Sequence, residues 1–141
     1  MNYSRIAIAA VGAFVTYFVL GGLSFALFPA LANEFKKYPA VYRPQDGMKK
    51  AMPVGMAAMF LAMVALAVLY AGLCDAGGGA AEGVRFGVIV GIFSVCTFVV
   101  HNYVNLNIGL TLTLQQALAY FIEWTATGLA IGLLYRPLIS H

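Results

Sequence analysis

Near the start of the chain, residues 5–28 read RIAIAAVGAFVTYFVLGGLSFALF, a run of 24 residues in which Arg5 is the one charged side chain. A membrane-spanning helix needs about 20 consecutive apolar residues, because each residue adds about 1.5 Å to a helix that must cross about 30 Å of hydrocarbon. The run is therefore long enough for one crossing with some tilt. Pro29 follows directly, and since proline cannot continue a helix, we expect this span to end at Phe28.

Three further apolar runs follow, at residues 53–73, 84–103 and 114–135. Together the runs predict an all-α fold, a membrane-embedded bundle of four transmembrane helices in which residues 1–141 form a single domain. The composition agrees, because 62% of the residues are hydrophobic, 9% are charged and the mean hydropathy is +0.89. A soluble domain has about 25% charged residues, so the numbers exclude a free soluble enzyme, a coiled coil and a disordered chain.

The segment between the first two runs is polar and carries five of the eight basic residues of the chain. Its apolar residues recur at helical spacing: Leu31, Phe35 and Tyr38. This pattern predicts a short interfacial helix between spans one and two, with its apolar side in the lipid headgroups and Lys36 and Lys37 pointing outward. Basic residues beside apolar runs fit a membrane surface rather than nucleic acid, so the expected partner is the lipid bilayer.

The other two connections are short. Residues 74–79 read CDAGGG, and three consecutive glycines favour a flexible turn. Residues 105–109 read NLNIG, a tight connection that makes the third and fourth spans antiparallel neighbours.

Glycines recur every four positions in the last two spans. They are Gly83, Gly87 and Gly91 in the third span and Gly128 and Gly132 in the fourth. Such spacing creates a flat helix face on which another backbone can approach closely. We expect these residues to serve helix packing within the bundle, with self-association between copies as the alternative.

Polar residues also recur at helical spacing in the last two spans. They are Ser94, Thr97, His101 and Asn105 in the third span and Gln116, Tyr120, Glu123 and Thr127 in the fourth. On antiparallel neighbours, the two stripes are stabilised best when they face each other, because lipid cannot solvate polar groups. The spacing therefore predicts a polar cluster buried in the membrane.

Glu123 is the most informative member of this cluster, because it lies near the middle of its span, where an ionised carboxylate is costly. Two interpretations are open. In one, Glu123 and His101 form a pair that carries protons or binds a ligand. In the other, a neutral Glu123 forms hydrogen bonds with Thr97, Gln116 or Tyr120 and holds two helices together.

A row of methionines precedes and enters the second span. It consists of Met48, Met52, Met56, Met59 and Met63, at intervals of 4, 4, 3 and 4. Thioethers are soft ligands suited to Cu(I), but methionine also packs adaptably against irregular neighbours. We expect packing and no metal site, with Cu(I) handling by Met52, Met56, Met59 and Met63 as the alternative. No cofactor is evident from the sequence, since it has no phosphate-binding loop and no Cys/His quartet.

Three stretches carry a resemblance to other proteins. They are YRP at residues 42–44, AEGVRFG at residues 81–87, and Glu123 followed by Gly128, Gly132 and LLYRP at residues 133–137. These motifs look like those of an uncharacterised family of small bacterial four-helix integral membrane proteins. The resemblance implies a four-helix fold in the bacterial inner (cytoplasmic) membrane and implies no activity.

The short connections between the spans leave little room for a soluble catalytic site, so a non-catalytic role is indicated. We expect an accessory or assembly subunit of a larger membrane complex, which contacts membrane-protein partners or copies of itself through its glycine and methionine faces. The alternative is a small transporter or channel for protons, ions or metals that uses Glu123 and His101, as a homo-oligomer because four helices rarely enclose a pore.

Overall fold

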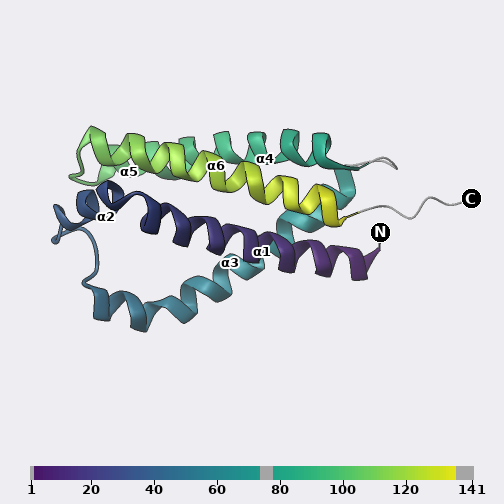
Figure 1. The fold of residues 1–141 in the computed structure, drawn as a ribbon, viewed down its shortest axis with the longest axis horizontal. Coiled ribbons are helices and arrows are strands. Elements are labelled where there is room, and N and C mark those ends of the chain that lie inside the picture. The colour runs from purple at the N-terminus through teal and green to yellow at the C-terminus, as the bar shows by residue number, and fades with distance from the viewer. Residues whose placement is uncertain (1, 74–77, 136–141) are drawn as a thin grey trace, which may run out of the picture.

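The computed structural model describes residues 2–73 and 78–135, which are helical apart from short connections (Figure 1). The elements in chain order are α1 (Tyr3–Leu27), α2 (Pro29–Lys36), α3 (Gln45–Leu73), α4 (Ala80–Ser94), the π-helix η1 (Val95–Val100), α5 (His101–Asn105) and α6 (Leu110–Leu134). The helices α4, η1 and α5 run on as one rod, Ala80–Asn105. The predicted all-α fold is confirmed.

Four helices in the described part of the chain are long and apolar enough to cross a membrane. They are Tyr3–Leu27, Gln45–Leu73, Ala80–Asn105 and Leu110–Leu134. This is the architecture of a multi-pass membrane protein in a lipid bilayer. The start of α1 and the end of α6 lie at the same end of the bundle, as four crossings require (Figure 1).

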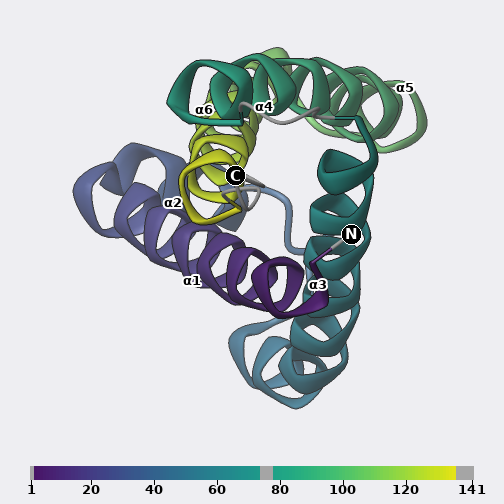
Figure 2. The same cartoon turned by 90° about the vertical axis from the view of Figure 1, so that its right-hand side faces the viewer.

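The bundle is built around α6. Viewed end-on, α6 lies between α4 and α1, and α3 packs against α1 (Figure 2). The contact between α3 and the bundle is confined to its second half, where Met63, Ala67 and Tyr70 are fully buried. In its first half, residues 52–58 are all exposed. The first half of α3 diverges from α1 (Figure 1).

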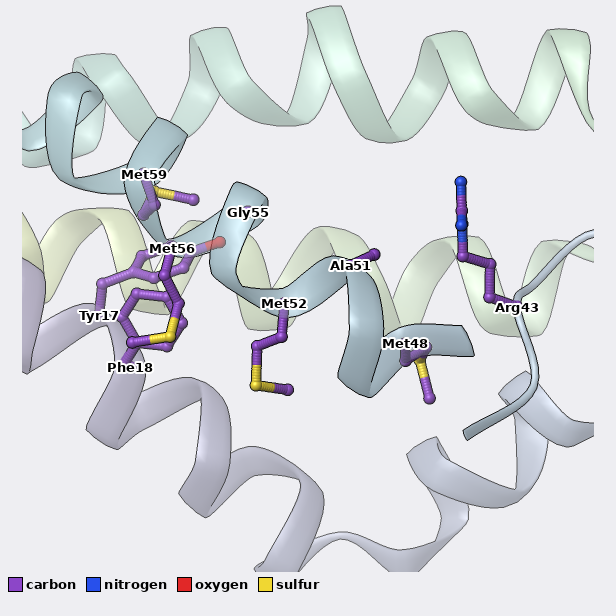
Figure 3. A pocket seen from close by; sticks show the side chains of 9 residues that line it. All are labelled: Tyr17, Phe18, Arg43, Met48, Ala51, Met52, Gly55, Met56 and Met59. Atoms are coloured by element: carbon purple, nitrogen blue, oxygen red, sulfur yellow. The ribbon is translucent and has the colours of Figure 1, made fainter. Parts of the chain in front are cut away.

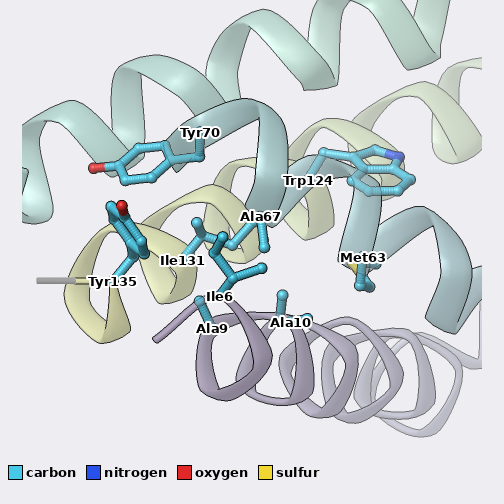
Figure 4. Packing of buried hydrophobic residues seen from close by; sticks show 10 residues of the cluster. Ile6, Ala9, Ala10, Met63, Ala67, Tyr70, Trp124, Ile131 and Tyr135 are labelled. Carbon is cyan, nitrogen blue, oxygen red and sulfur yellow. The ribbon is translucent and has the colours of Figure 1, made fainter. Parts of the chain in front are cut away.

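Small residues let α1 approach its neighbours closely. Ala9, Ala10 and Ala13 of α1 have no exposed surface, and larger side chains from α3 and α6 pack over them (Figure 4). At one end of this core, the rings of Tyr70 and Tyr135 meet edge to face with 5.9 Å between centroids. Apolar packing of this kind stabilises helix association where water does not drive it.

The rod and α6 touch backbone to backbone at the predicted packing glycines. A Cβ added at Gly83 would lie 2.6 Å from the carbonyl oxygen of Gly128, and one added at Gly87 would lie 2.8 Å from Cα of Thr125. Gly132 also lies against Gly83, and Gly91 lies against the side chain of Phe121. All five glycines are buried in this α4–α6 contact.

All four spans begin earlier than the apolar runs predict, with α1 beginning at Tyr3 rather than residue 5 and α4 at Ala80 rather than residue 84. Helix α3 begins at Gln45 rather than residue 53, so Pro53 lies inside it instead of in its first turn. The turns before Pro53 contain Lys49 and Lys50, which the apolar pattern excluded, whereas Asp46 in the first turn favours a helix start there. Helix α6 begins at Leu110 rather than residue 114.

The short helix between spans one and two is present as α2, and Pro29 occupies its first turn, where a missing N–H costs nothing. Its apolar side does not face the surroundings as expected. Leu31 packs with Ile108 and Leu112, so α2 is attached to the start of α6. Lys36 and Lys37 point outward as predicted, and a hydrogen bond to Glu34 raises the pKa of Lys37.

Some predicted features lie outside the described residues. The first four residues of the glycine turn, 74–77, belong to this group, as do Arg136 and Pro137 of the third resemblance motif.

Candidate functional site

A cavity of about 490 Å³ lies inside the bundle, bounded by α1, α2, η1, α5, α6 and the diverging half of α3. Its wall is rich in aromatic side chains: Phe18, Phe25, Phe35, Tyr42, Phe98 and Tyr120. Its volume lies within the range of about 300–1,000 Å³ that is usual for small-molecule sites. The cavity is therefore large enough for a ligand with several rings.

Glu123 of α6 lines this cavity and is 6% exposed. Its carboxyl group lies against the backbone of α1, because a Cβ added at Gly21 would be 3.7 Å from Oε1 of Glu123. The missing side chain at Gly21 thus makes room for the carboxyl group. The helix at this point is reinforced by Thr127, whose hydroxyl donates to the Glu123 carbonyl oxygen at 2.7 Å.

Two tyrosines lie beside Glu123, Tyr17 from α1 and Tyr120 from the preceding turn of α6. The Tyr17 hydroxyl donates a hydrogen bond to that of Tyr120, and both are within electrostatic reach of the carboxyl group. Trp124 packs on the Tyr17 ring with 5.1 Å between centroids. These contacts fix the position of Glu123 between α1 and α6.

Gln116 supplies an open acceptor at the same cavity. Its Nε2 donates to the Tyr42 hydroxyl at 3.3 Å, and the Tyr42 ring is held by Phe35 at 4.8 Å between centroids. Its Oε1 is buried and has no hydrogen-bond partner among the described residues. A buried acceptor without a partner is unfavourable, so a donor that reached it would be stabilised.

The structure does not bring the polar residues of the rod to Glu123. Thr97, His101 and Asn105 are exposed. The Thr97 hydroxyl donates to the Phe93 carbonyl oxygen at 2.7 Å, and the Asn105 amide donates to the His101 carbonyl oxygen at 2.8 Å. The pairing of Glu123 with His101, one of the interpretations that the sequence leaves open, is not formed, and of the six predicted cluster residues only Glu123, Gln116 and Tyr120 line the cavity.

The π-helix η1 explains this difference. Residues in an α-helix follow each other at about 100° around the axis, and a π-helical turn holds about one residue more than an α-turn. Every residue after η1 is therefore rotated by about one position relative to the glycine face of α4. As a result Asn102, and not His101, lines the cavity.

Several residues of the cavity carried no pattern in the sequence. Tyr17 and Gly21 belong to α1, which has no polar stripe, and Tyr42 lies in the connection before α3. A hydroxyl-bearing ring in the middle of an apolar run was the available signal for Tyr17, because such a ring needs a polar partner when it is buried.

The methionine row lines a neighbouring hollow of about 340 Å³ between α3 and α1. Met48, Met52, Met56 and Met59 are strung along the helix, with Arg43 at the end of the row (Figure 3). Met63 belongs to the core instead (Figure 4). The thioethers do not converge on one point, and the described residues contain no group of three His, Cys, Asp or Glu that could hold a metal ion.

No known protein family, curated protein or solved structure matches the chain. The resemblance to small bacterial four-helix proteins therefore stays a prediction, and the function has to be argued from the geometry alone.

Proposed function

We propose that the protein is a non-catalytic subunit of a larger complex in the bacterial inner membrane, and that the first half of α3 binds a transmembrane helix of another subunit. The observation that carries this proposal is the unequal packing of α3. Residues 52–58 are all exposed, whereas Met63, Ala67 and Tyr70 further along the same helix are fully buried.

The side chains on the diverging half suit a helix-binding surface. Met52 and Met56 are exposed, and methionine adapts its shape to irregular neighbours. A Cβ added at Gly55 would meet nothing within 4 Å, so a second backbone can approach α3 there. A partner helix would fill the 340 Å³ hollow against α1.

The parts of the described chain outside the spans are small. The connections at residues 37–44 and 106–109 are short, and α2 is packed against α6. Such segments have no room for a soluble catalytic site, which supports a role through contacts inside the bilayer.

The experiment is purification of the tagged protein from native membranes in a mild detergent. We expect a larger membrane protein to co-purify in fixed proportion, and about tenfold less of it with Gly55→Leu, because overpacking an interface costs about 1–3 kcal/mol. Gly72→Leu is the matched control, since a Cβ at Gly72 also meets nothing within 4 Å but lies on the packed half of α3. Recovery only as a free homo-oligomer would contradict the proposal.

A small transporter is the alternative function. Its transport site would use Glu123 alone, because Glu123 lines a cavity whereas His101 is exposed. Ion-dependent flux in liposomes that is lost in Glu123→Gln and kept in His101→Ala would favour this alternative. Cu(I) handling by the methionine row stays a prediction without a convergent geometry.

A further inference from the structure

The cavity beside Glu123 combines one acidic group with a lining that has no positive charge. No lysine, arginine or histidine lines it in the part of the chain that the structure describes. Arg43 lines the neighbouring hollow, and His101 is exposed. The tyrosine hydroxyls beside Glu123 and the Asn102 amide in the lining are neutral donors, so the charge of a carboxylate there has no positive partner among the described residues that line the cavity.

The neutral polar groups point to the same kind of ligand. One N–H of the Gln116 amide donates to the Tyr42 hydroxyl, whereas Oε1 of Gln116 is buried with no partner among the described residues. Gln116 is 7% exposed, and it lines the same cavity as Glu123. A carboxylate and an open amide oxygen are both acceptors, and their common complement is a donor or a cation.

The aromatic side chains that line the cavity indicate what kind of cation the ligand is. Phe98 and Tyr120 stack with 5.4 Å between centroids, and Phe18 and Phe25 of α1 also line the cavity. Aromatic faces attract cations, especially weakly hydrated organic ones, and they also bind apolar rings. A bare metal ion is a poor fit, because no group of three metal-ligating side chains is found among the described residues.

The way into the cavity also favours a ligand that dissolves in lipid. Met52, on the diverging half of α3, shares the lining with residues of α1 and α6. Met52 is 54% exposed, so the lining reaches the surface of the bundle at this residue. A ligand can therefore approach the cavity from the bilayer.

We propose that this cavity binds a lipophilic organic cation, whose charged centre pairs with Glu123 and whose apolar body lies among the aromatic side chains. The cavity shares Tyr17, Phe18 and Met52 with the hollow where the partner helix is proposed to bind, whereas Glu123 and Gln116 line the cavity alone. The Gln116 oxygen accepts a hydrogen bond when the ligand is a protonated amine.

The first test measures binding of tetraphenylphosphonium to the full-length protein in detergent by equilibrium dialysis. We expect saturable binding at about one ligand per chain. Tetraphenylborate has the same shape and the opposite charge, and we expect no saturable binding of it. Absence of saturable tetraphenylphosphonium binding, or equal binding of both ions, would overturn the proposal.

The second test uses variants. We expect Glu123→Gln to weaken tetraphenylphosphonium binding at least tenfold. Glu82→Gln is the control, because it removes a carboxyl group at the start of α4, outside the cavity lining. Unchanged affinity in Glu123→Gln, or an equal loss in both variants, would contradict the assignment.

The third test uses a second pair of variants. It replaces the Glu123→Gln test if that variant does not fold, as judged by circular dichroism and gel filtration. Gly21→Leu places a branched side chain against the carboxyl group, and we expect at least a tenfold loss of affinity. Gly72→Leu makes the same change at an open position outside the cavity and should keep the affinity of the unaltered protein. Equal affinity in the two leucine variants would overturn the proposal.

Discussion

At the scale of single residues, the glycines of the α4–α6 contact show that close backbone packing, and not ion pairing, joins these two helices. A Cβ added at Gly128 would lie 2.3 Å from Cα of Gly87, so two backbones occupy the volume that side chains fill elsewhere. The four-residue spacing predicted such a face, because it follows directly from the period of a helix. The spacing could not predict which residue of the neighbouring helix each glycine would contact.

Gly128→Ala should therefore destabilise the protein even though alanine favours a helix by about 1 kcal/mol over glycine. The added methyl group forces α4 and α6 apart, and overpacking of this kind costs about 1–3 kcal/mol. Gly72→Ala, at an open position of α3, should leave the melting temperature equal or slightly higher. Thermal unfolding in detergent, followed by intrinsic fluorescence, measures both, and equal melting temperatures would contradict the packing argument.

The connection before α3 holds a second testable contact. The Tyr38 hydroxyl accepts a hydrogen bond from the backbone N–H of Gly109 at 2.9 Å, which joins the segment after α2 to the start of α6. Tyr38→Phe removes this acceptor and should lower the free energy of unfolding by about 1 kcal/mol. Tyr3→Phe is the matched control, because Tyr3 is 78% exposed. A loss of similar size in both variants would show that the Tyr38 contact contributes nothing specific.

At the scale of the elements, the sequence predicted the four spans well and their contacts less well. Long apolar runs are a strong signal because the bilayer thickness sets their length. The start of α3 was missed since Lys49 and Lys50 interrupt the apolar pattern, and η1 was missed since nothing local in residues 95–100 requires a π-turn. The faces of the rod therefore could not be aligned correctly, and His101 was expected where Asn102 lies.

The π-helix η1 predicts that the protein tolerates the deletion of one residue within it. Deleting Val100, which is exposed, should convert η1 into ordinary α-helix while leaving both the glycine face and Asn102 in place. Deleting Ile89, also exposed but within α4, should rotate the following residues by about 100° and misalign the helix. Gel filtration of fluorescently tagged variants compares the two, and the expected result is a monodisperse peak for the first deletion only. Equal damage by both would show that η1 holds no surplus residue.

At the scale of the whole molecule, α6 is the element on which the others depend. It contacts α4, α1 and α2, and it supplies Glu123 and Gln116 to the cavity. A chain that ends after residue 107 would retain α1 packed against α3, but the rod would lose its main neighbour. We expect its level in the membrane to fall at least several-fold in a pulse-chase experiment, and to recover when residues 108–141 are produced as a separate piece. A stable truncated chain would contradict this central role.

The contact between α1 and α6 also bears on how the protein is made. Helix α1 leaves the ribosome well before α6, so a surface that contains Ala9, Ala10 and Ala13 stays partly unmatched until α6 has been made. The rod Ala80–Asn105 and α6 are joined by residues 106–109 alone, so they close much more easily because the loop-closure entropy is small. We therefore expect α1 to close onto a preformed hairpin of the rod and α6. Until that step, the newly made chain is exposed to membrane proteases and insertion chaperones.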